Sequence, residues 1–277
     1  MQLRIRNELL DLSRPVVMGI LNVTSDSFSD GGRYTDIEAA LRRASCMVDD
    51  GAGIIDVGGE STRPGSLPVA QEFELERVVP VVAAICRRLD VAVSIDTGKA
   101  AVMRAAVAAG AVMINDVYAL QQPGALDAAV GLDAAVCLMH MQGKPSTMQD
   151  NPRYRNVVVE VTGFLESRAA QCIAAGIAPD RIVIDPGFGF GKSDAHNITL
   201  LAGLGKLRSL QRPILVGLSR KGTLGKLTGR PVGERLAAGL AAAVLAVERG
   251  ANIVRTHDVG PTVDALKFAR AVLQQEI

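Results

Sequence analysis

Eight short apolar runs, separated by longer helical stretches, constrain the fold of this 277-residue chain more than any other feature. Each run is almost continuously apolar, which is typical of parallel strands that are buried on both faces. The runs are VVMGILNV, GIIDVGG, VAVSID, VMINDV, AAVCLMH, RIVIDPG, PILVGLS and NIVRTH, which begin at Val16, Gly53, Val91, Val112, Ala134, Arg181, Pro213 and Asn252. Open doubly wound sheets and closed barrels both alternate strands with helices. Eight regular units with a last helix near the C-terminus favour the closed (β/α)8 TIM barrel, an α/β fold.

The stretches between these runs predict helices over residues 36–50, 71–89, 100–109, 156–175 and 261–274. No linker or low-complexity segment interrupts the alternation, so we expect a single domain over residues 1–277. The residues before the first strand predict a short hairpin or plug over the bottom of the barrel.

Composition bears on the partners and the compartment. Lys and Arg number 30 against 29 Asp and Glu, a balance that argues against a nucleic-acid partner or a polybasic membrane protein. The four cysteines lie in apolar surroundings without a C-x-x-C pair, which favours reduced thiols; they are Cys46, Cys86, Cys137 and Cys172. The first residues, MQLRIRNELLDLSRP, lack the apolar segment of a signal peptide. The longest apolar run, 236–247, is shorter than the ~20 residues of a membrane helix. We therefore expect a cytoplasmic protein without a membrane segment.

Residues 236–247, LAAGLAAAVLAV, are apolar on every face of the predicted helix. A helix on the outside of a barrel normally keeps one polar face toward water. Something must therefore cover this helix, and two interpretations remain open. An inserted helix packs over it, or it forms a homodimer interface, since alanine-rich faces allow close packing and two-fold dimers are the commonest assembly.

Polar residues follow all eight predicted strands. In chain order they are Asn22, Asp56, Asp96, Asn115 with Asp116, His140, Asp185, Ser219 with Arg220 and Lys221, and Arg255 with His257 and Asp258. A single Asp after a strand is ordinarily a helix N-cap, and a single Arg is ordinarily a solvated charge. In a parallel barrel, however, the carboxyl ends of the strands meet at one mouth, where the active site lies. Eight polar ends in succession therefore predict a binding or catalytic site.

The residue types at this mouth fall into three groups. Asp96, Asn115 and Asp185 offer carboxylate and amide groups that suit a flat heterocycle rich in N–H donors. Cationic or donor groups suited to a diphosphate are Arg63, Lys221, Arg255 and His257. Asn22 offers a neutral oxygen to Mg²⁺, an ion that keeps most of its waters and needs few protein ligands.

Three of the six phenylalanines fall outside the predicted helices: Phe28 in SDSFSDGG, and Phe188 and Phe190 in DPGFGFGK. Such rings either tuck back and close their loops or form an aromatic slot for a planar ligand, and we favour the slot. The neighbouring GFGFGKS resembles a phosphate-binding P-loop. That motif requires Gly five residues before Gly191, where this chain has Pro186, so a kinase or ATPase is not expected.

These segments are similar to those of the dihydropteroate synthase family. The matching stretches are GILNVTSDSFSDGG, DVGGESTRPG, SIDT, INDV, MHMQGKPSTMQ, DPGFGFGK, GLSRKG and RTHDV, in the family's order from Gly19 to Val259. One departure is Ser25, where members commonly carry Pro; it should loosen the first loop without touching a reacting group. The resemblance implies an enzyme of folate biosynthesis that uses Mg²⁺. It joins a dihydropterin methyl diphosphate to 4-aminobenzoate and releases pyrophosphate, and sulfonamides compete with the aminobenzoate.

The resemblance also implies residue roles. The pterin-binding set corresponds to Asp96, Asn115, Asp185 and Lys221, with Asp185 on the 2-amino and N3–H edge and Lys221 on the O4/N5 side. Arg255 resembles the residue that flanks the ring and reaches the diphosphate, which Asn22 with Mg²⁺, His257 and Thr62 also contact. The aminobenzoate site, assembled partly from the loops after the first two strands, corresponds to Phe28, Thr62, Arg63, Pro64, Phe190 and Ser219.

The chemistry explains why such groups are needed. The attacking arylamine is neutral at pH 7, so no strong general base is required. Negative charge grows on the leaving diphosphate, and the groups expected to neutralise it, with Mg²⁺, are Arg63, Arg255 and His257. The electron-rich dihydropterin favours an SN1-like path, in which Asp30 stabilises the cation or accepts the amine's proton. Asp30 can also be read as a turn residue before Gly31 and Gly32. Closure of the first two loops would exclude water.

Two other functions remain as alternatives. A methyltransferase of the methyltetrahydrofolate–corrinoid type would share Asp96, Asn115 and Asp185, but it has no use for an arginine-rich diphosphate end. A non-catalytic pterin-binding paralogue would be expected to lose loop residues, whereas both loops are complete in this sequence.

Overall fold

Eight parallel strands close into a barrel in the computed structural model, which describes residues 1–23, 32–61, 66 and 68–273. The strands are β3 (Val16–Asn22), β4 (Ile54–Gly58), β5 (Ala92–Asp96), β6 (Met113–Asp116), β7 (Ala135–Met139), β8 (Ile182–Asp185), β9 (Leu215–Val216) and β10 (Ile253–Thr256). Neighbours along the chain are neighbours in the sheet, and β10 pairs with β3. A parallel bridge between Ile184 and Ile214 joins β8 to β9 and closes the ring. The predicted (β/α)8 barrel is confirmed.

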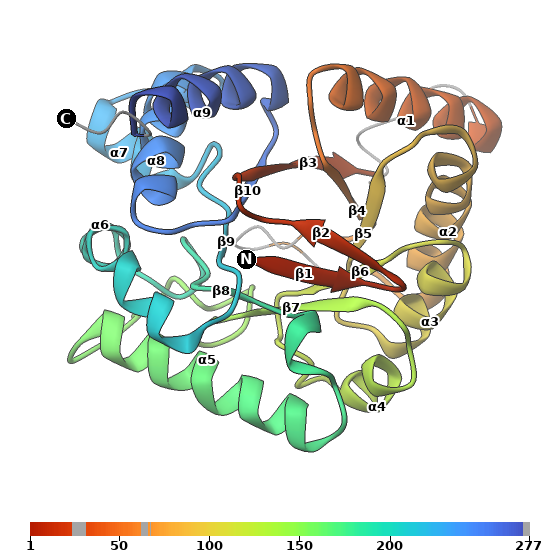
Figure 1. Cartoon of the computed structure of the whole chain (residues 1–277), viewed down its shortest axis with the longest axis horizontal. Helices are drawn as coiled ribbons and strands as arrows, with labels where there is room; N and C mark the ends of the chain where they lie inside the picture. Colours follow the sequence, from red (N-terminus) through yellow and green to blue (C-terminus); the bar gives the residue numbers. More distant parts are fainter. Residues whose placement is uncertain (24–31, 62–65, 67, 274–277) are drawn as a thin grey trace.

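Helices surround these strands (Figure 1). They are α1 (Gly32–Asp49), α2 (Gln71–Arg88), α3 (Ala100–Ala108), α4 (Ala125–Val130), α5 (Val157–Ala174), α6 (Asp194–Ala202), α7 (Gly222–Thr228), α8 (Leu236–Glu248) and α9 (Val259–Leu273). Shorter 3-10 turns are η2 (Pro179–Arg181), η3 (Leu204–Leu210) and η4 (Val232–Glu234). The buried faces of the helices and the outward-facing side of the strands form the larger part of the core.

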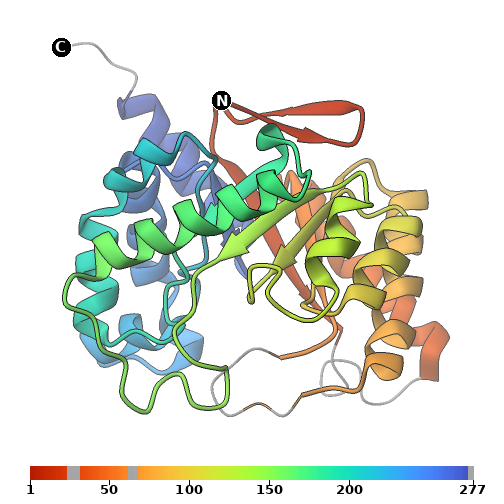
Figure 2. The same cartoon turned by 90° about the horizontal axis from the view of Figure 1, so that it is seen from below.

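A two-stranded antiparallel hairpin precedes the barrel, as predicted. Its strands are β1 (Gln2–Ile5) and β2 (Glu8–Asp11). Leu3 and Ile5 are buried and pack in one cluster with Met18 and Met113 from the barrel strands. Figure 2 shows the hairpin at the end of the barrel opposite the loops that follow the strands. The hairpin therefore plugs one end and leaves the carboxyl ends of the strands as the accessible mouth.

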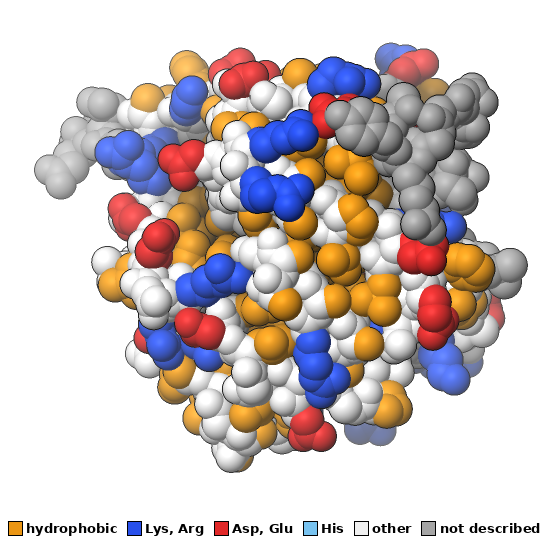
Figure 3. Space-filling view, turned by 90° about the vertical axis from the view of Figure 1, so that its right-hand side faces the viewer, with side chains coloured by type: hydrophobic (Ala, Val, Ile, Leu, Met, Phe, Trp, Pro, Cys, Tyr) orange, Lys and Arg blue, Asp and Glu red, His pale blue; other side chains and the backbone are white. Residues whose placement is uncertain are grey.

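Charges of both signs are interspersed with apolar side chains on the face that α1, α2 and α3 form (Figure 3). The described residues of this face therefore form no extended field of one sign of the kind that steers polyanions. Among the described residues, no helix combines the length and the apolar character that crossing a bilayer requires. The cytoplasmic location stays a prediction.

Candidate active site

Three of the predicted site residues lie in one row across the mouth of the barrel. Strand register pairs Asn22 with Gly58, Gly58 with Asp96, and Asp96 with Asn115. Each of these residues ends, or nearly ends, its strand, because a parallel barrel brings equivalent positions of neighbouring strands to the same height. Residues that are up to 93 positions apart in the sequence are therefore adjacent in space.

One guanidinium bridges two carboxylates at this row. Nε of Arg255, on β10, lies 2.6 Å from Oδ2 of Asp56, and its Nη2 lies 2.7 Å from Oδ2 of Asp96. Nδ2 of Asn115 donates to the same Oδ2 of Asp56 at 3.0 Å. The Asp56 side chain is fully buried, whereas that of Arg255 remains 20% exposed. Four strands are thus tied together by charge-assisted contacts directly beneath the mouth.

Burial controls the charges of this cluster. It raises the pKa of Asp96 to about 7; Arg255 opposes that shift, and the nearby carboxylates add to it. Burial alone would lower the pKa of Arg255, but Asp56 and Asp96 together outweigh it, and the net shift is upward. The guanidinium therefore stays positive, while Asp96 exchanges its proton near neutral pH.

Asp185 and Lys221 form the second charged pair of the mouth. Asp185 is 6% exposed, and the backbone N–H of Gly187 donates to its Oδ1 at 2.7 Å. Burial raises the pKa of Asp185 to about 6, against the effects of Gly187, Lys221 and Arg255. Burial likewise lowers the pKa of Lys221 to about 8, against the attraction of Asp185. Because Asp185 and Arg255 each shift the other's pKa, the two residues share one electrostatic environment.

The loop after β8 places one aromatic ring at the site and removes another. Nζ of Lys221 lies 4.2 Å from the centre of the Phe190 ring, a cation–π arrangement. Gly189 adopts φ +79°, and a Cβ there would come within 3.1 Å of the Lys221 side chain. Phe188, in contrast, is 2% exposed and packs in the hydrophobic core. The expected aromatic slot is therefore wrong for Phe188, which tucks back and closes the loop.

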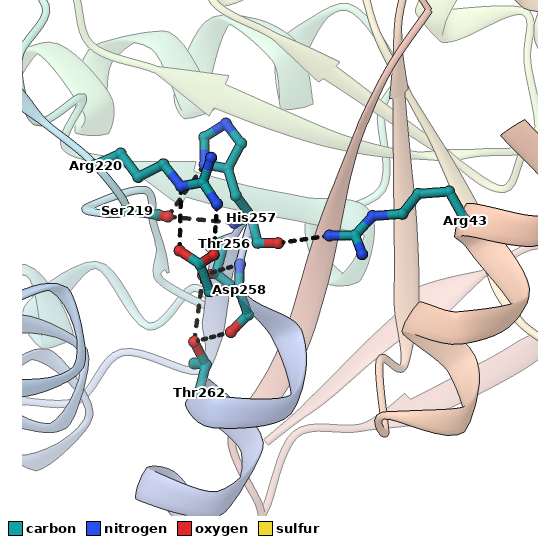
Figure 4. A network of polar contacts seen from close by, with 7 residues as sticks. All are labelled: Arg43, Ser219, Arg220, Thr256, His257, Asp258 and Thr262. Atoms are coloured by element: carbon teal, nitrogen blue, oxygen red, sulfur yellow. Dashed lines mark hydrogen bonds and ion pairs between the residues drawn. The ribbon is translucent and has the colours of Figure 1, made fainter. Parts of the chain in front are cut away.

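Figure 4 shows the polar network that holds His257. Oγ of Ser219, after β9, lies 3.1 Å from Nδ1 of His257 and accepts from its backbone N–H at 3.2 Å. Arg220 binds both carboxylate oxygens of Asp258, at 3.2 and 2.5 Å. Nη2 of Arg43, on α1, donates to the carbonyl oxygen of His257 at 3.1 Å. Contacts from α1 and the loop after β9 therefore hold the backbone of His257, and Ser219 contacts its imidazole.

Asp116, another strand-end residue, has only a local role in the structure. Its carboxylate accepts from the backbone N–H groups of Tyr118 and Leu120 at 2.8 and 2.7 Å. These bonds stabilise the turn after β6, where Ala119 and Leu120 adopt positive φ angles. Asp116 is therefore a turn residue and not a helix N-cap, since the next helix, α4, begins at Ala125 with Gly124 as its N-cap.

Five predicted site residues lie outside the described residues, and they are Phe28, Asp30, Thr62, Arg63 and Pro64. Among the residues that are described, no group of three His, Cys, Asp or Glu side chains could hold a metal ion by itself. Asn22, half-buried at the end of β3, is consistent with an ion whose other ligands come from water or substrate.

Sequence reasoning placed Asp56 at a strand end but assigned it no role. The available signal was an acid within the otherwise apolar strand GIIDVGG. A second residue without an assigned role is Lys192, which belongs to the failed P-loop match and ends the stretch DPGFGFGK. Its side chain is 2% exposed and bonds to the loop that carries Phe190.

Comparison with known proteins agrees with this geometry. A family model described as pterin binding enzyme matches residues 18–257. The dihydropteroate synthase of Escherichia coli K12 is 50% identical over 273 residues, which cover 99% of this chain and 97% of that protein. The chain belongs to the dihydropteroate synthase family. The Haemophilus influenzae member is 49% identical over 271 residues, with 98% of each chain covered.

Solved structures of dihydropteroate synthases share the fold throughout. The Yersinia pestis enzyme in a sulfonamide complex superposes with a TM-score of 0.94 at 49% identity, covering 99% of this chain and 100% of that one. The Xanthomonas albilineans enzyme with 4-aminobenzoic acid has a TM-score of 0.93 at 51% identity, with 99% of both chains covered. The same enzyme in complex with 7,8-dihydropteroate has a TM-score of 0.91 at 48% identity, with both chains fully covered.

Proposed function

We propose that the chain condenses (7,8-dihydropterin-6-yl)methyl diphosphate with 4-aminobenzoate to give 7,8-dihydropteroate and pyrophosphate. The observation that carries the proposal is the mouth itself, where buried acceptors and cations lie together. Asp185 and Asp96 offer acceptors for the N–H groups of a pterin, and Arg255 and Lys221 offer positive charge within the same electrostatic environment. The complexes of similar enzymes with 4-aminobenzoic acid and with 7,8-dihydropteroate support it.

Ring recognition is assigned to the acceptors and donors of β5, β6 and β8. Asp185 accepts from the 2-amino and N3–H groups, and Lys221 donates on the O4/N5 side. Asp96 and Asn115 bind the remaining edge; Asp56 fixes the amide of Asn115 by accepting from its Nδ2. Phe190, covered by the Lys221 ammonium, lies where it can bound one side of the slot.

Departure of the diphosphate is assigned to Arg255 and His257, with Arg63 from the second loop. In its neutral form, His257 has its tautomer set by Ser219. Since the Ser219 hydroxyl already accepts from the His257 backbone, its own proton is available to Nδ1, and the ring proton then lies on Nε2 as a donor. Asn22 and diphosphate oxygens would hold Mg²⁺, which neutralises charge on the leaving group when bound.

The loop residues complete the proposed mechanism. Thr62 contacts the diphosphate, and the aminobenzoate site adds Phe28, Thr62, Pro64 and Ser219 to Phe190. Asp30 stabilises a cationic methylene or accepts the amine's proton on the SN1-like path. A sulfonamide of the kind bound by the Yersinia pestis enzyme would compete with 4-aminobenzoate.

Release of pyrophosphate tests the proposed function directly. The purified chain is expected to release one pyrophosphate per dihydropteroate from the pterin diphosphate and 4-aminobenzoate, with less product when Mg²⁺ is chelated. Methyl transfer from methyltetrahydrofolate to a corrinoid acceptor would support the methyltransferase instead. Tight pterin binding without turnover would identify a non-catalytic paralogue.

Affinity for the pterin is expected to fall as the pH drops through about 6. The pKa of Asp185 is raised to about 6, mainly by burial, so the acceptor form predominates only above that pH. Below it the carboxyl is protonated and accepts fewer N–H bonds, and affinity declines about tenfold per pH unit. Calorimetric titration between pH 5 and pH 8 measures the profile. An affinity that stays constant over this range would contradict the role of Asp185.

We also propose a homodimer through residues 236–247. On α8, Ala242, Ala243 and Ala246 are buried within the protomer, whereas Leu236 and Leu245 are 41% and 40% exposed. The short helix α7 packs against α8, as the inserted-helix alternative required, but the two leucines remain uncovered in the described structure. A two-fold partner would bury them.

Replacement of Leu245 with Glu is expected to convert the dimer to a monomer, because it places a charge in an apolar interface. Leu9→Glu is the matched control, since Leu9 is 57% exposed on the distant hairpin. Sedimentation velocity at micromolar concentration measures both variants. A wild-type chain that sediments as a monomer would refute the dimer.

A further inference from the structure

The structure contains a buried lysine that the proposed mechanism does not use. Lys192 follows the loop after β8, and its side chain is among the largest fully buried ones in the described part of the chain, at 2% exposed. Removing an amino group from water is unfavourable unless hydrogen-bond acceptors replace the water. The position of Lys192 is therefore maintained by specific partners.

Backbone carbonyl groups supply most of these partners. Nζ of Lys192 lies 2.8 Å from the oxygen of Gly187, 3.0 Å from that of Phe190 and 3.3 Å from that of His140. It also lies 2.9 Å from Nδ1 of His140. Burial, with the Lys192 charge, lowers the pKa of His140 to about 3, so its ring is neutral and can accept. Burial lowers the pKa of Lys192 itself to about 7, and both its ammonium and its amine form donate to these acceptors.

The shape of the loop explains why such a donor is needed. Gly187 and Gly191 adopt φ +68° and +61°, in the left-handed region. A Cβ at Gly187 would overlap the carbonyl oxygen of His140, and one at Gly191 would overlap that of Gln142. The loop therefore packs directly against the segment after β7, and three carbonyl oxygens converge on Nζ of Lys192. Lys192 donates to all three of these carbonyl groups, and the oxygen of Gly187 also accepts from the backbone N–H of Phe190.

Two of the residues that accept from Lys192 also take part in the proposed site. Gly187 accepts from Lys192 through its oxygen and donates through its N–H to Oδ1 of Asp185 at 2.7 Å. Phe190 accepts from Lys192 through its oxygen, and its ring lies against the Lys221 ammonium. Lys192 is thus linked to Asp185 through Gly187, and to the ring that lies against Lys221 through the backbone of Phe190.

We propose that Lys192 is a positioning residue for pterin recognition: it holds the loop after β8 in the shape that presents Asp185 and Phe190 to the ring. This inference rests on the proposed function. It assigns Lys192 no contact with substrate, and it predicts a defect confined to the ring end of the ligand, because Arg255 and His257 are carried by β10 and its following loop.

Replacement of Lys192 with Met tests this role, because Met approximates the length of the side chain and removes all donors. Affinity for 6-hydroxymethyl-7,8-dihydropterin, a ring without diphosphate, is expected to fall at least about tenfold. Affinity for inorganic pyrophosphate with Mg²⁺ is expected to stay within about twofold of wild type. Lys192→Gln, which keeps an N–H donor, should recover part of the lost pterin affinity. Lys206→Met, at an exposed lysine on η3, is the control.

Calorimetry of both ligands, with a thermal unfolding curve for each variant, distinguishes the outcomes. Unchanged pterin affinity in Lys192→Met would overturn the inference, as would equal losses for pterin and pyrophosphate. If Lys192→Met does not fold, His140→Leu is the second variant, because it removes only one acceptor of Lys192. It should weaken pterin binding about two- to fivefold. Unchanged pterin affinity in this variant would overturn the inference. A wild-type chain that binds no dihydropterin would instead count against the proposed function.

Discussion

Asp185→Asn is expected to weaken binding of the dihydropterin diphosphate by about 30- to 900-fold. The buried carboxylate offers two acceptor oxygens, one of which already receives the Gly187 N–H. Asparagine would replace one acceptor by a donor that faces the N–H groups of the ring. Loss of such paired, charge-assisted bonds costs about 2–4 kcal/mol.

Asp180→Asn is the matched control, because it removes the same charge from a side chain that is 54% exposed and pairs with Arg4 at the surface. Calorimetric dissociation constants at pH 8, where Asp185 is ionised, compare the two variants with wild type. Pterin affinity close to wild type in Asp185→Asn would remove Asp185 from the site.

Arg255→Met should have the largest effect on both stability and turnover. It leaves the buried carboxylates of Asp56 and Asp96 without their shared cation. Removing one partner of a buried ion pair lowers the free energy of unfolding by about 3 kcal/mol. Turnover should fall about 100-fold or more, because a charge that stabilises the leaving diphosphate is lost.

The loss of stability in Arg255→Met should be larger at high pH than at low pH, and this direction would identify an uncompensated carboxylate as its cause. Burial holds the folded-state pKa of Asp96 near 7, above the usual value of 3.8, and removal of Arg255 raises it further. A protonated Asp96 needs no cation, so the stability lost in the variant should become smaller as the pH falls from 8 toward 4.

Urea unfolding at several pH values measures this trend. The control is Arg230→Met, which breaks an ion pair with Glu234 whose side chains are 63% and 57% exposed. Such surface pairs contribute about 0–1 kcal/mol. An equal destabilisation of Arg255→Met at pH 5 and pH 8 would show that the carboxylates do not cause it.

The barrel was predictable from the sequence because its signal is local and repeated. Runs such as VAVSID and VMINDV are apolar throughout, and the polar residues Asp96 and Asn115 mark the points where these strands end. In a parallel barrel the carboxyl ends of the strands meet at one mouth. The residues that line this mouth could therefore be predicted without knowledge of any side-chain contact.

The partners within the mouth could not be predicted in the same way. The bridge from Arg255 to Asp56 joins residues 199 positions apart and depends on strand register, which local patterns do not encode. Lys192 and Phe188 belong to a loop whose alternate glycines turn the side chains inward. Glycine-rich sequences permit many conformations, and tertiary contacts alone select among them.

The hairpin beneath the barrel contributes to stability at a place that is separate from the proposed substrate site. Leu3 and Ile5 pack against buried apolar side chains of the barrel strands. These contacts lie at the end of the barrel opposite the proposed ligand site. Substitutions in the hairpin should therefore alter the unfolding temperature while substrate affinities stay the same, whereas a rim residue such as Arg255 contributes to both. The unfolding temperature of this enzyme can therefore be changed from the hairpin without a change in substrate affinity.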